Sequence, residues 1–194
     1  GVLMHVPGLS LLCLSLASSS GMSVHTVLQP VGAGGDVSCG THPNGFWEVR
    51  LENSSPTAFE ALETALGKTA AAEAHGVVLT AAADALSSGD CEAQLAANSK
   101  SPALQATLRS ICRERPVICV AEGNVQGAAA GLFLACSHRV TTSSTILSLP
   151  EVRVGLCPTS ASALCEAGVA PHMAMYAAMT GSPLNSHDLV SLAL

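Results

Sequence analysis

The sequence predicts an α/β fold, because short apolar runs alternate with helix-forming segments along its 194 residues. That length suits one domain. Hydrophobic residues make up 48% of the chain and charged residues only 11%, a composition typical of a well-packed globule and not of a disordered protein. The aromatic share of 3%, beside many alanines and glycines, indicates backbones that approach one another closely.

Residues 1–44 show no convincing periodicity, so we expect a poorly defined N-terminal segment before a domain over residues 45–194. Strands are indicated by alternating or continuous apolar residues, and helices by alanine, leucine and glutamate with a proline near the first turn. The first predicted elements are a half-buried strand at Phe46–Leu51, a helix over Ala58–Ala74 that Asn53–Pro56 introduces, and a buried strand at Val77–Thr80.

The second half continues the alternation of helix and strand. Its predicted elements are a helix over Pro102–Arg113, a strand at Val117–Ala121, a turn at Gly123–Gly127, a helix over Ala128–Cys136, and strand-like runs at Arg139–Thr142 and Thr145–Leu147.

A candidate reaction site follows from the small residues between Gly123 and Gly131. They let a ligand approach the backbone, and the first-turn N–H groups of the following helix can point at a developing negative charge. Glu151 is a single carboxylate in an otherwise apolar stretch. An anion-stabilising turn with one isolated acid suggests enolate chemistry.

At these positions the chain resembles the crotonase (enoyl-CoA hydratase/isomerase) superfamily. The resemblance rests on six blocks in the family's order: Val77–Thr80, Leu86–Asp90, Pro116–Ile118, Glu122–Ala129, Pro150–Pro158 and Met179–Leu184. It implies a crotonase-like spiral of β-β-α units. In relatives, C-terminal helices used in trimer formation begin near the position of Leu194, so that helical part is expected to be largely missing here, and the homo-oligomer that the resemblance implies is a trimer.

The resemblance also implies roles for individual residues. The backbone N–H groups of Asp90 and Ala128 would form an oxyanion hole for the thioester oxygen, and Glu151 would be the catalytic acid–base. The residues expected to bind substrate are Ser88, Gly89, Gly127 and Pro158.

The expected activity is that of an enoyl-CoA isomerase of fatty-acid β-oxidation. Hydratases of the family carry a second glutamate, at the position of Gly131, and a glycine there cannot do acid–base work. One carboxylate suffices to move a double bond from the 3- to the 2-position. Two alternatives stay open: a hydratase or thioester hydrolase that takes its second group from Asp90 or Glu166, and a non-catalytic acyl-CoA-binding protein.

Structural explanations of the same residues also stay open. Glu151 can pair with Arg153 or cap a turn. Residues 87–90 can form a helix N-cap and have no part in catalysis, since serine and aspartate favour the N-cap position.

The net charge and the cysteine spacing bear on which ligands the chain can bind. The net charge of −6, without a cluster of lysine and arginine, argues against nucleic acid. No Cys-x-x-Cys pair occurs among the eight cysteines, so we expect no metal site and buried, reduced thiols. The resemblance implies a coenzyme A thioester as the substrate and no cofactor. The apolar run Leu9–Ala17 is too short to span a membrane. We expect a mitochondrial or peroxisome-like organelle, with the cytoplasm as the alternative.

Overall fold

The computed structural model describes residues 2–3, 28–31, 35–41, 45–53, 55–71, 74–81, 86 and 91–194, with the backbone alone for residues 2–3, 56, 69–71 and 91–100. Its strands are β1 (Val2–Leu3), β2 (Gln29–Val31), β3 (Val37–Thr41), β4 (Phe46–Leu51), β5 (Gly76–Ala81), β6 (Val117–Ala121), β7 (Asn124–Gln126), β8 (His138–Thr142), β9 (Ile146–Ser148) and β10 (Leu184–Asn185). Its helices are α1 (Pro56–Ala71), α2 (Cys91–Glu114), α3 (Ala128–Ala135), the 3-10 helix η1 (Pro150–Val154), α4 (Ala161–Glu166), α5 (Pro171–Thr180) and α6 (Ser186–Ser191).

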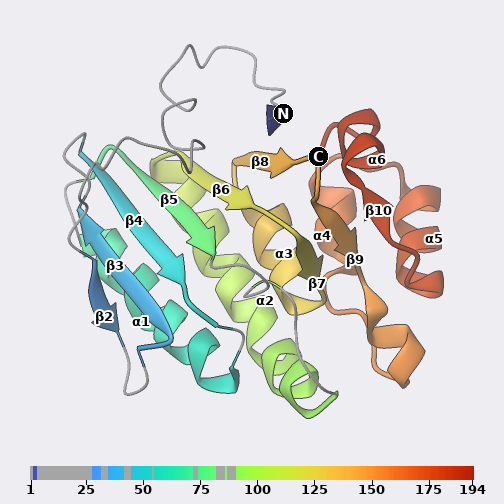
Figure 1. The fold of residues 1–194 in the computed structure, drawn as a ribbon, viewed down its shortest axis with the longest axis horizontal. Helices are drawn as coiled ribbons and strands as arrows, with labels where there is room; N and C mark the ends of the chain where they lie inside the picture. Colours follow the sequence, from blue (N-terminus) through green and yellow to red (C-terminus); the bar gives the residue numbers. More distant parts are fainter. Residues whose placement is uncertain are drawn as a thin grey trace.

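The main sheet has seven strands in the order β1-β8-β6-β5-β4-β3-β2. The four central strands β4, β5, β6 and β8 run parallel, while β1, β2 and β3 pair antiparallel at the two edges. Helices α1, α2 and α3 lie on one side of this sheet (Figure 1). The parallel strands joined by helices confirm the α/β class.

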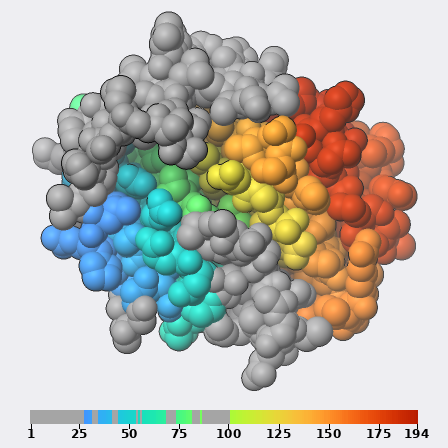
Figure 2. Space-filling view, viewed as in Figure 1, coloured from blue at the N-terminus to red at the C-terminus, as the bar shows by residue number. Residues whose placement is uncertain are grey.

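The second sheet is small, with three strands in the order β10-β9-β7. It lies between the main sheet and the C-terminal helices (Figure 1). In Figure 2 the blue atoms, which include β2 and β3, and the red atoms of the C-terminal residues lie at opposite sides of the same face. From β2 to β8 the strands of the main sheet follow one another in sequence order, with β7 in the small sheet, and β1 pairs with β8 at the far edge.

The core lies between the main sheet and its helices. Helix α1 packs on β3 and β4, and α2 packs on α1, α3 and β6. Leucines supply much of the buried volume, with Phe133 of α3 among the largest fully buried side chains. Four of these leucines come from the inward faces of α1 and α2: Leu62, Leu66, Leu104 and Leu108. Burying each such side chain stabilises the fold by about 1.5–3 kcal/mol.

The strand predicted at residues 46–51 is confirmed with the same bounds, and the helices and strands predicted from residue 58 to residue 80 are confirmed within a few residues. The helix predicted from Pro102 is wrong at its start, because α2 begins at Cys91 and Pro102 lies inside it. A proline inside a helix removes one hydrogen-bond donor, which disfavours but does not forbid the helix. Packing of α2 against α1 and α3 compensates for that loss.

The sequence pattern predicts no strand before Phe46, yet β2 and β3 extend the sheet beyond β4. Asp36, just before β3, explains how this hairpin is held. Its carboxylate accepts hydrogen bonds from Asn53 at 2.7 Å, from the Ser55 hydroxyl at 3.0 Å and from the Thr57 hydroxyl. It therefore fastens the β2–β3 hairpin to the start of α1, the helix that Asn53–Pro56 was predicted to introduce.

Asp36→Ala is expected to lower the free energy of unfolding at pH 7 by about 2 kcal/mol, because the side chains of Asn53, Ser55 and Thr57, which are exposed or partly buried, lose a charged acceptor. The Thr57 hydroxyl, then the Asn53 amide, hold the pKa of the Asp36 carboxyl below its usual value. A lowered pKa gives stability that is present above the unfolded pKa of about 3.9 and is lost as the pH falls through the folded pKa.

Urea unfolding at pH 7 and pH 3 checks this expectation: the difference from wild type is large at pH 7 and shrinks at pH 3. Glu63→Ala, which removes an exposed carboxylate of α1, is the control, with an expected change below about 0.5 kcal/mol. An equal loss at both pH values would contradict the charged role of Asp36.

The cysteines of the described residues are free thiols. Cys119 and Cys136 are buried and Cys112 is partly buried, as expected, and Cys39 is buried as well. Cys157 and Cys165 are exposed, so the expectation of buried thiols is wrong for these two. Neither lies in a strand or on an inward-facing helix position, because Cys157 belongs to a connecting segment and Cys165 lies on the outer face of α4. In the described part of the chain, no helix combines the length and the apolar character that crossing a bilayer requires.

Candidate active site

The small sheet brings the two predicted halves of the site to one edge. Strands β7 and β9 are parallel, with Gln126 opposite Ser148. The N–H of Gly127 donates to the Ser148 carbonyl at 3.1 Å and extends this ladder by one hydrogen bond. Because parallel strands end at the same edge of a sheet, α3 and η1 both begin there. Ala128 follows Gln126 by two residues, and Glu151 follows Ser148 by three.

The first half of the site is the start of α3. Gly127 is its N-cap, with φ +58° and ψ −124°, a conformation that glycine adopts without steric cost. The helix that follows consists of small and apolar residues, all buried. The N–H groups of its first turn have no partner within the helix and carry the positive end of its dipole. The N–H of Ala128 is therefore available to a negatively charged oxygen.

The second half is Glu151 in η1. Its side chain is fully buried, at 0% exposure, and neither carboxylate oxygen accepts a hydrogen bond from another described residue. Burial raises the pKa of the Glu151 carboxyl, and its own backbone N–H opposes that rise more weakly. Such a carboxyl is costly to the fold and suits proton transfer.

The alternative that Glu151 pairs with Arg153 is not supported. Arg153 is exposed, and no ion pair joins it to Glu151 among the described contacts. The Arg153 side chain instead lies against Gly181 at the end of α5. The backbone carbonyl of Glu151 accepts the N–H of Leu156 at 2.8 Å, so the residue's backbone, but not its carboxylate, serves the turn.

Gly131 lies on the face of α3 that meets α2 and α4. A Cβ added to Gly131 would come under 3.0 Å from Gln105 Nε2 and from Ser160 Oγ, closer than real Cβ atoms approach other atoms. Gln105 and Ser160 are themselves buried. The absence of a side chain at residue 131 is therefore part of the packing of this site.

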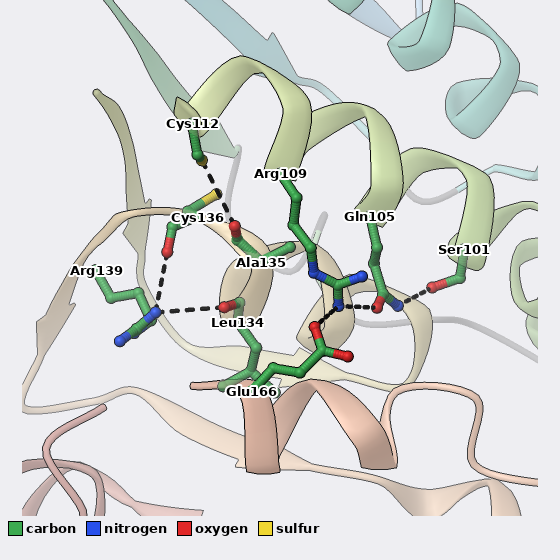
Figure 3. A network of polar contacts seen from close by, with 9 residues as sticks. All are labelled: Ser101, Gln105, Arg109, Cys112, Leu134, Ala135, Cys136, Arg139 and Glu166. Atoms are coloured by element: carbon green, nitrogen blue, oxygen red, sulfur yellow. Dashed lines mark hydrogen bonds and ion pairs between the residues drawn. The ribbon is translucent and has the colours of Figure 1, made fainter. Parts of the chain in front are cut away.

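Gln105 belongs to a polar network that Figure 3 shows between α2, α3 and α4. Its Nε2 donates to Ser101 Oγ at 2.8 Å, and its Oε1 accepts from Arg109 at 3.1 Å. Arg109 also forms an ion pair with Glu166 at 2.5 Å. Glu166, one candidate for a second acid, is thus half exposed and engaged with a cation, which argues against acid–base work.

Of the other predicted site residues, the structure describes Pro158 but not Ser88, Gly89 or Asp90. Pro158 is partly buried in the segment between η1 and α4. Ser88, Gly89 and Asp90 lie outside the described residues, so their roles stay predictions. Among the described residues, no three histidine, cysteine, aspartate or glutamate side chains gather into a metal-ligand set.

Sequence reasoning missed Gln105, Ser160 and Ser101 as site residues. Ser101 and Gln105 are four residues apart and so share one face of a helix, a weak signal that does not indicate burial. Ser160 carries no signal that distinguishes it from its neighbour Ser162. Only the packing of α2 and α4 on α3 brings these side chains to the site.

The chain matches one protein family by sequence and several solved structures by fold. A family model described as Enoyl-CoA hydratase/isomerase matches residues 59–194. The chain is similar to an enoyl-CoA hydratase from Mycobacterium marinum, with 19% identity, a TM-score of 0.70 and coverage of 81% of this chain and 74% of that one. It is also similar to human enoyl Coenzyme A hydratase domain-containing protein 3, with 20% identity, a TM-score of 0.69 and coverage of 80% and 67%.

A third similar structure, an enoyl-CoA hydratase from Thermoplasma volcanium, has 18% identity, a TM-score of 0.66 and coverage of 81% and 68%. The small ribosomal subunit protein mS47 of Arabidopsis thaliana is 29% identical over 80 residues, which are 41% of this chain and 20% of that protein. The chain spans about two thirds of the length of the first solved structures it matches, and one fifth of this curated relative.

Proposed function

Because the chain belongs to the enoyl-CoA hydratase/isomerase family, we propose that it is an enoyl-CoA isomerase of fatty-acid β-oxidation that converts a 3-enoyl-CoA into a 2-enoyl-CoA. The observation that carries this proposal is Glu151, a fully buried carboxylate with no hydrogen-bond partner among the described residues. A group that destabilises the fold in this way is more simply explained by chemistry than by structure.

The reaction is a proton shuttle by one carboxylate. Glu151 takes a proton from C2 of the 3-enoyl thioester, and the electron pair moves onto the thioester oxygen. The N–H of Ala128, with that of Asp90 as the resemblance implies, stabilises the enolate, and each preorganised donor contributes about 3–4 kcal/mol. Glu151 returns the proton at C4, and the double bond lies between C2 and C3 with no atom gained or lost.

The observed surroundings of Gly131 favour isomerisation over hydration. Hydration needs a group that activates water in addition to Glu151. The position where the family's hydratases hold a second glutamate is taken up by the Gln105 amide and the Ser160 hydroxyl, neither of which is a base at neutral pH.

The pH dependence of the reaction follows from Glu151. Its carboxylate must be ionised to accept the proton from C2, and burial raises its pKa. We expect kcat/KM for isomerisation to fall as the pH drops through this raised pKa, so the acidic limb lies above the usual glutamate value of about 4.3. Initial rates between pH 4 and pH 9 measure the limb. A limb at or below the usual value would contradict the assignment of Glu151 as the base.

The activity is tested with two substrates. Purified protein receives a 3-enoyl-CoA while the absorbance of the conjugated 2-enoyl thioester is followed, and a parallel sample receives a 2-enoyl-CoA and is followed for loss of that absorbance. A rise in the first sample alone supports an isomerase. Loss in the second identifies a hydratase. Silence in both samples, with acyl-CoA still bound, identifies the non-catalytic alternative.

Substrate contacts, assembly and compartment are proposals that rest on the same family membership. Ser88, Gly89, Gly127 and Pro158 are proposed to contact the acyl-CoA. A homotrimer is proposed by the resemblance, and sedimentation velocity measures the oligomeric state. The free thiols agree with a reducing compartment, for which we propose a mitochondrial or peroxisome-like organelle.

A further inference from the structure

The carbonyl of Gly127 and the N–H of Ala128 belong to one peptide group. That group is planar and trans, so whatever holds the carbonyl also sets the direction of the N–H. The Gly127 carbonyl accepts two hydrogen bonds, from the Ser160 hydroxyl at 3.0 Å and from the N–H of Gly131 at 3.3 Å. The peptide that presents the Ala128 N–H is therefore held from its opposite side.

Ser160 makes this contact in place of a local one. It is the N-cap of α4, a position where a serine hydroxyl commonly accepts from an N–H of its own helix, but no such bond is present. The side chain is fully buried and points to the Gly127 carbonyl instead. α4 thus gives up its own side-chain cap, and α3 gains a fixed first peptide.

Gly131 leaves room for the Ser160 contact, and Ser101 makes a similar contact with the next peptide group. Gly131 has no side chain, and a Cβ there would meet Ser160 Oγ under 3.0 Å. Ser101, which Gln105 holds at 2.8 Å, lies 3.5 Å from the Ala128 carbonyl. That carbonyl belongs to the next peptide group, so buried polar side chains from two flanking segments hold successive peptides of the first turn of α3.

We propose that Ser160 is a positioning residue that orients and polarises the Gly127–Ala128 peptide, so that the Ala128 N–H meets the substrate oxygen as a fixed, strengthened donor. Hydrogen bonds in a chain polarise one another, and a donor fixed before the reaction costs no reorganisation. The inference rests on the proposed function, because it concerns the donor that stabilises the enolate.

The test compares Ser160→Ala, Ser160→Cys and the control Ser162→Ala, which removes an exposed hydroxyl of the same helix. For isomerisation of a 3-enoyl-CoA we expect Ser160→Ala to lower kcat about tenfold, less than the loss of a whole oxyanion donor, with KM nearly unchanged. Ser160→Cys keeps the size of the side chain with a weaker donor and should fall between wild type and alanine.

A second readout needs no turnover. In the ligand-free protein labelled with ¹⁵N-alanine, the Ala128 amide resonance should shift upfield in Ser160→Ala, less in Ser160→Cys, and not in Ser162→Ala. Circular dichroism and thermal unfolding show which variants are folded. If Ser160→Ala does not fold, the cysteine variant still measures both effects.

The outcomes separate the two proposals. A wild-type protein that turns over no enoyl-CoA, while the Ala128 resonance responds only to changes at Ser160, defeats the proposed function and leaves the peptide contact supported. A wild-type isomerase whose kcat changes no more in Ser160→Ala than in Ser162→Ala overturns the inference. An Ala128 resonance that ignores Ser160 overturns it as well, whatever the activity.

Discussion

Glu151→Gln is expected to lower kcat for isomerisation by about a thousandfold, because an amide of the same shape cannot accept the proton from C2. The same variant should be more stable than wild type at neutral pH. Burial raises the pKa of Glu151, and a raised carboxyl pKa gives stability that is present below the unfolded pKa and is lost as the pH rises through the folded one. Glutamine carries no charge and escapes this loss.

Steady-state kinetics and urea unfolding between pH 4 and pH 8 measure both effects. The stability advantage of Glu151→Gln should grow with pH. Glu166→Gln is the matched control, since Glu166 is half exposed and paired with Arg109, and it should leave kcat almost unchanged. Full activity in Glu151→Gln would remove Glu151 from the mechanism, and a loss of stability at neutral pH would indicate a structural carboxylate.

Gly131→Glu is expected to lower the free energy of unfolding by about 4 kcal/mol or to prevent folding. The new side chain starts where Gln105 Nε2 and Ser160 Oγ now lie, so both must leave their hydrogen bonds. The new carboxylate is also buried, while Arg109, the cation that contacts Gln105, is already paired with Glu166. For the same reason the variant should not gain hydration of a 2-enoyl-CoA, although it restores a second acid.

Gly67→Glu is the control for the change from glycine to glutamate. Gly67 lies on the exposed face of α1, and nothing would touch an added Cβ within 4 Å. Glutamate forms helix better than glycine, so we expect this control to be neutral or more stable. Urea unfolding compares the two variants. A Gly131→Glu protein as stable as Gly67→Glu would show that the packing around Gly131 is loose.

The central part of the fold could be predicted because local patterns there agree with the final packing. Strands β5 and β6 are apolar runs whose side chains are mostly buried in the sheet, and β4 alternates in its second half, as a half-buried strand does. Strand β3 escaped prediction because Val37–Thr41 contains serine, glycine and threonine, and its partner β4 and the Asp36 contacts stabilise it. The helix predicted for this region was too short, because proline is a strong but purely local signal and Pro102 lies inside α2.

The candidate site also has residues that local patterns indicate and residues that only the packing reveals. Glu151 and Ala128 lie in contiguous motifs that follow the two strands of one parallel pair, so local patterns alone select them as candidates, and their roles stay predictions. Gln105 and Ser160 come from segments far from α3 along the chain, and ordinary polar residues carry no sign of the partner they reach. Their part in the site depends on helix packing, which no local pattern encodes.

The site depends on the smaller of the two sheets, whose strands have only two or three residues. β10, near the C-terminal end, pairs with β9 and so joins the last helix to the strand that precedes Glu151. Short ladders open at a lower free energy than a seven-stranded sheet, so amides of β7 and β9 should exchange with solvent hydrogen faster than those of β5 and β6. In mild urea the geometry of the candidate site would then be lost in a separate, reversible opening, while the main sheet stays folded.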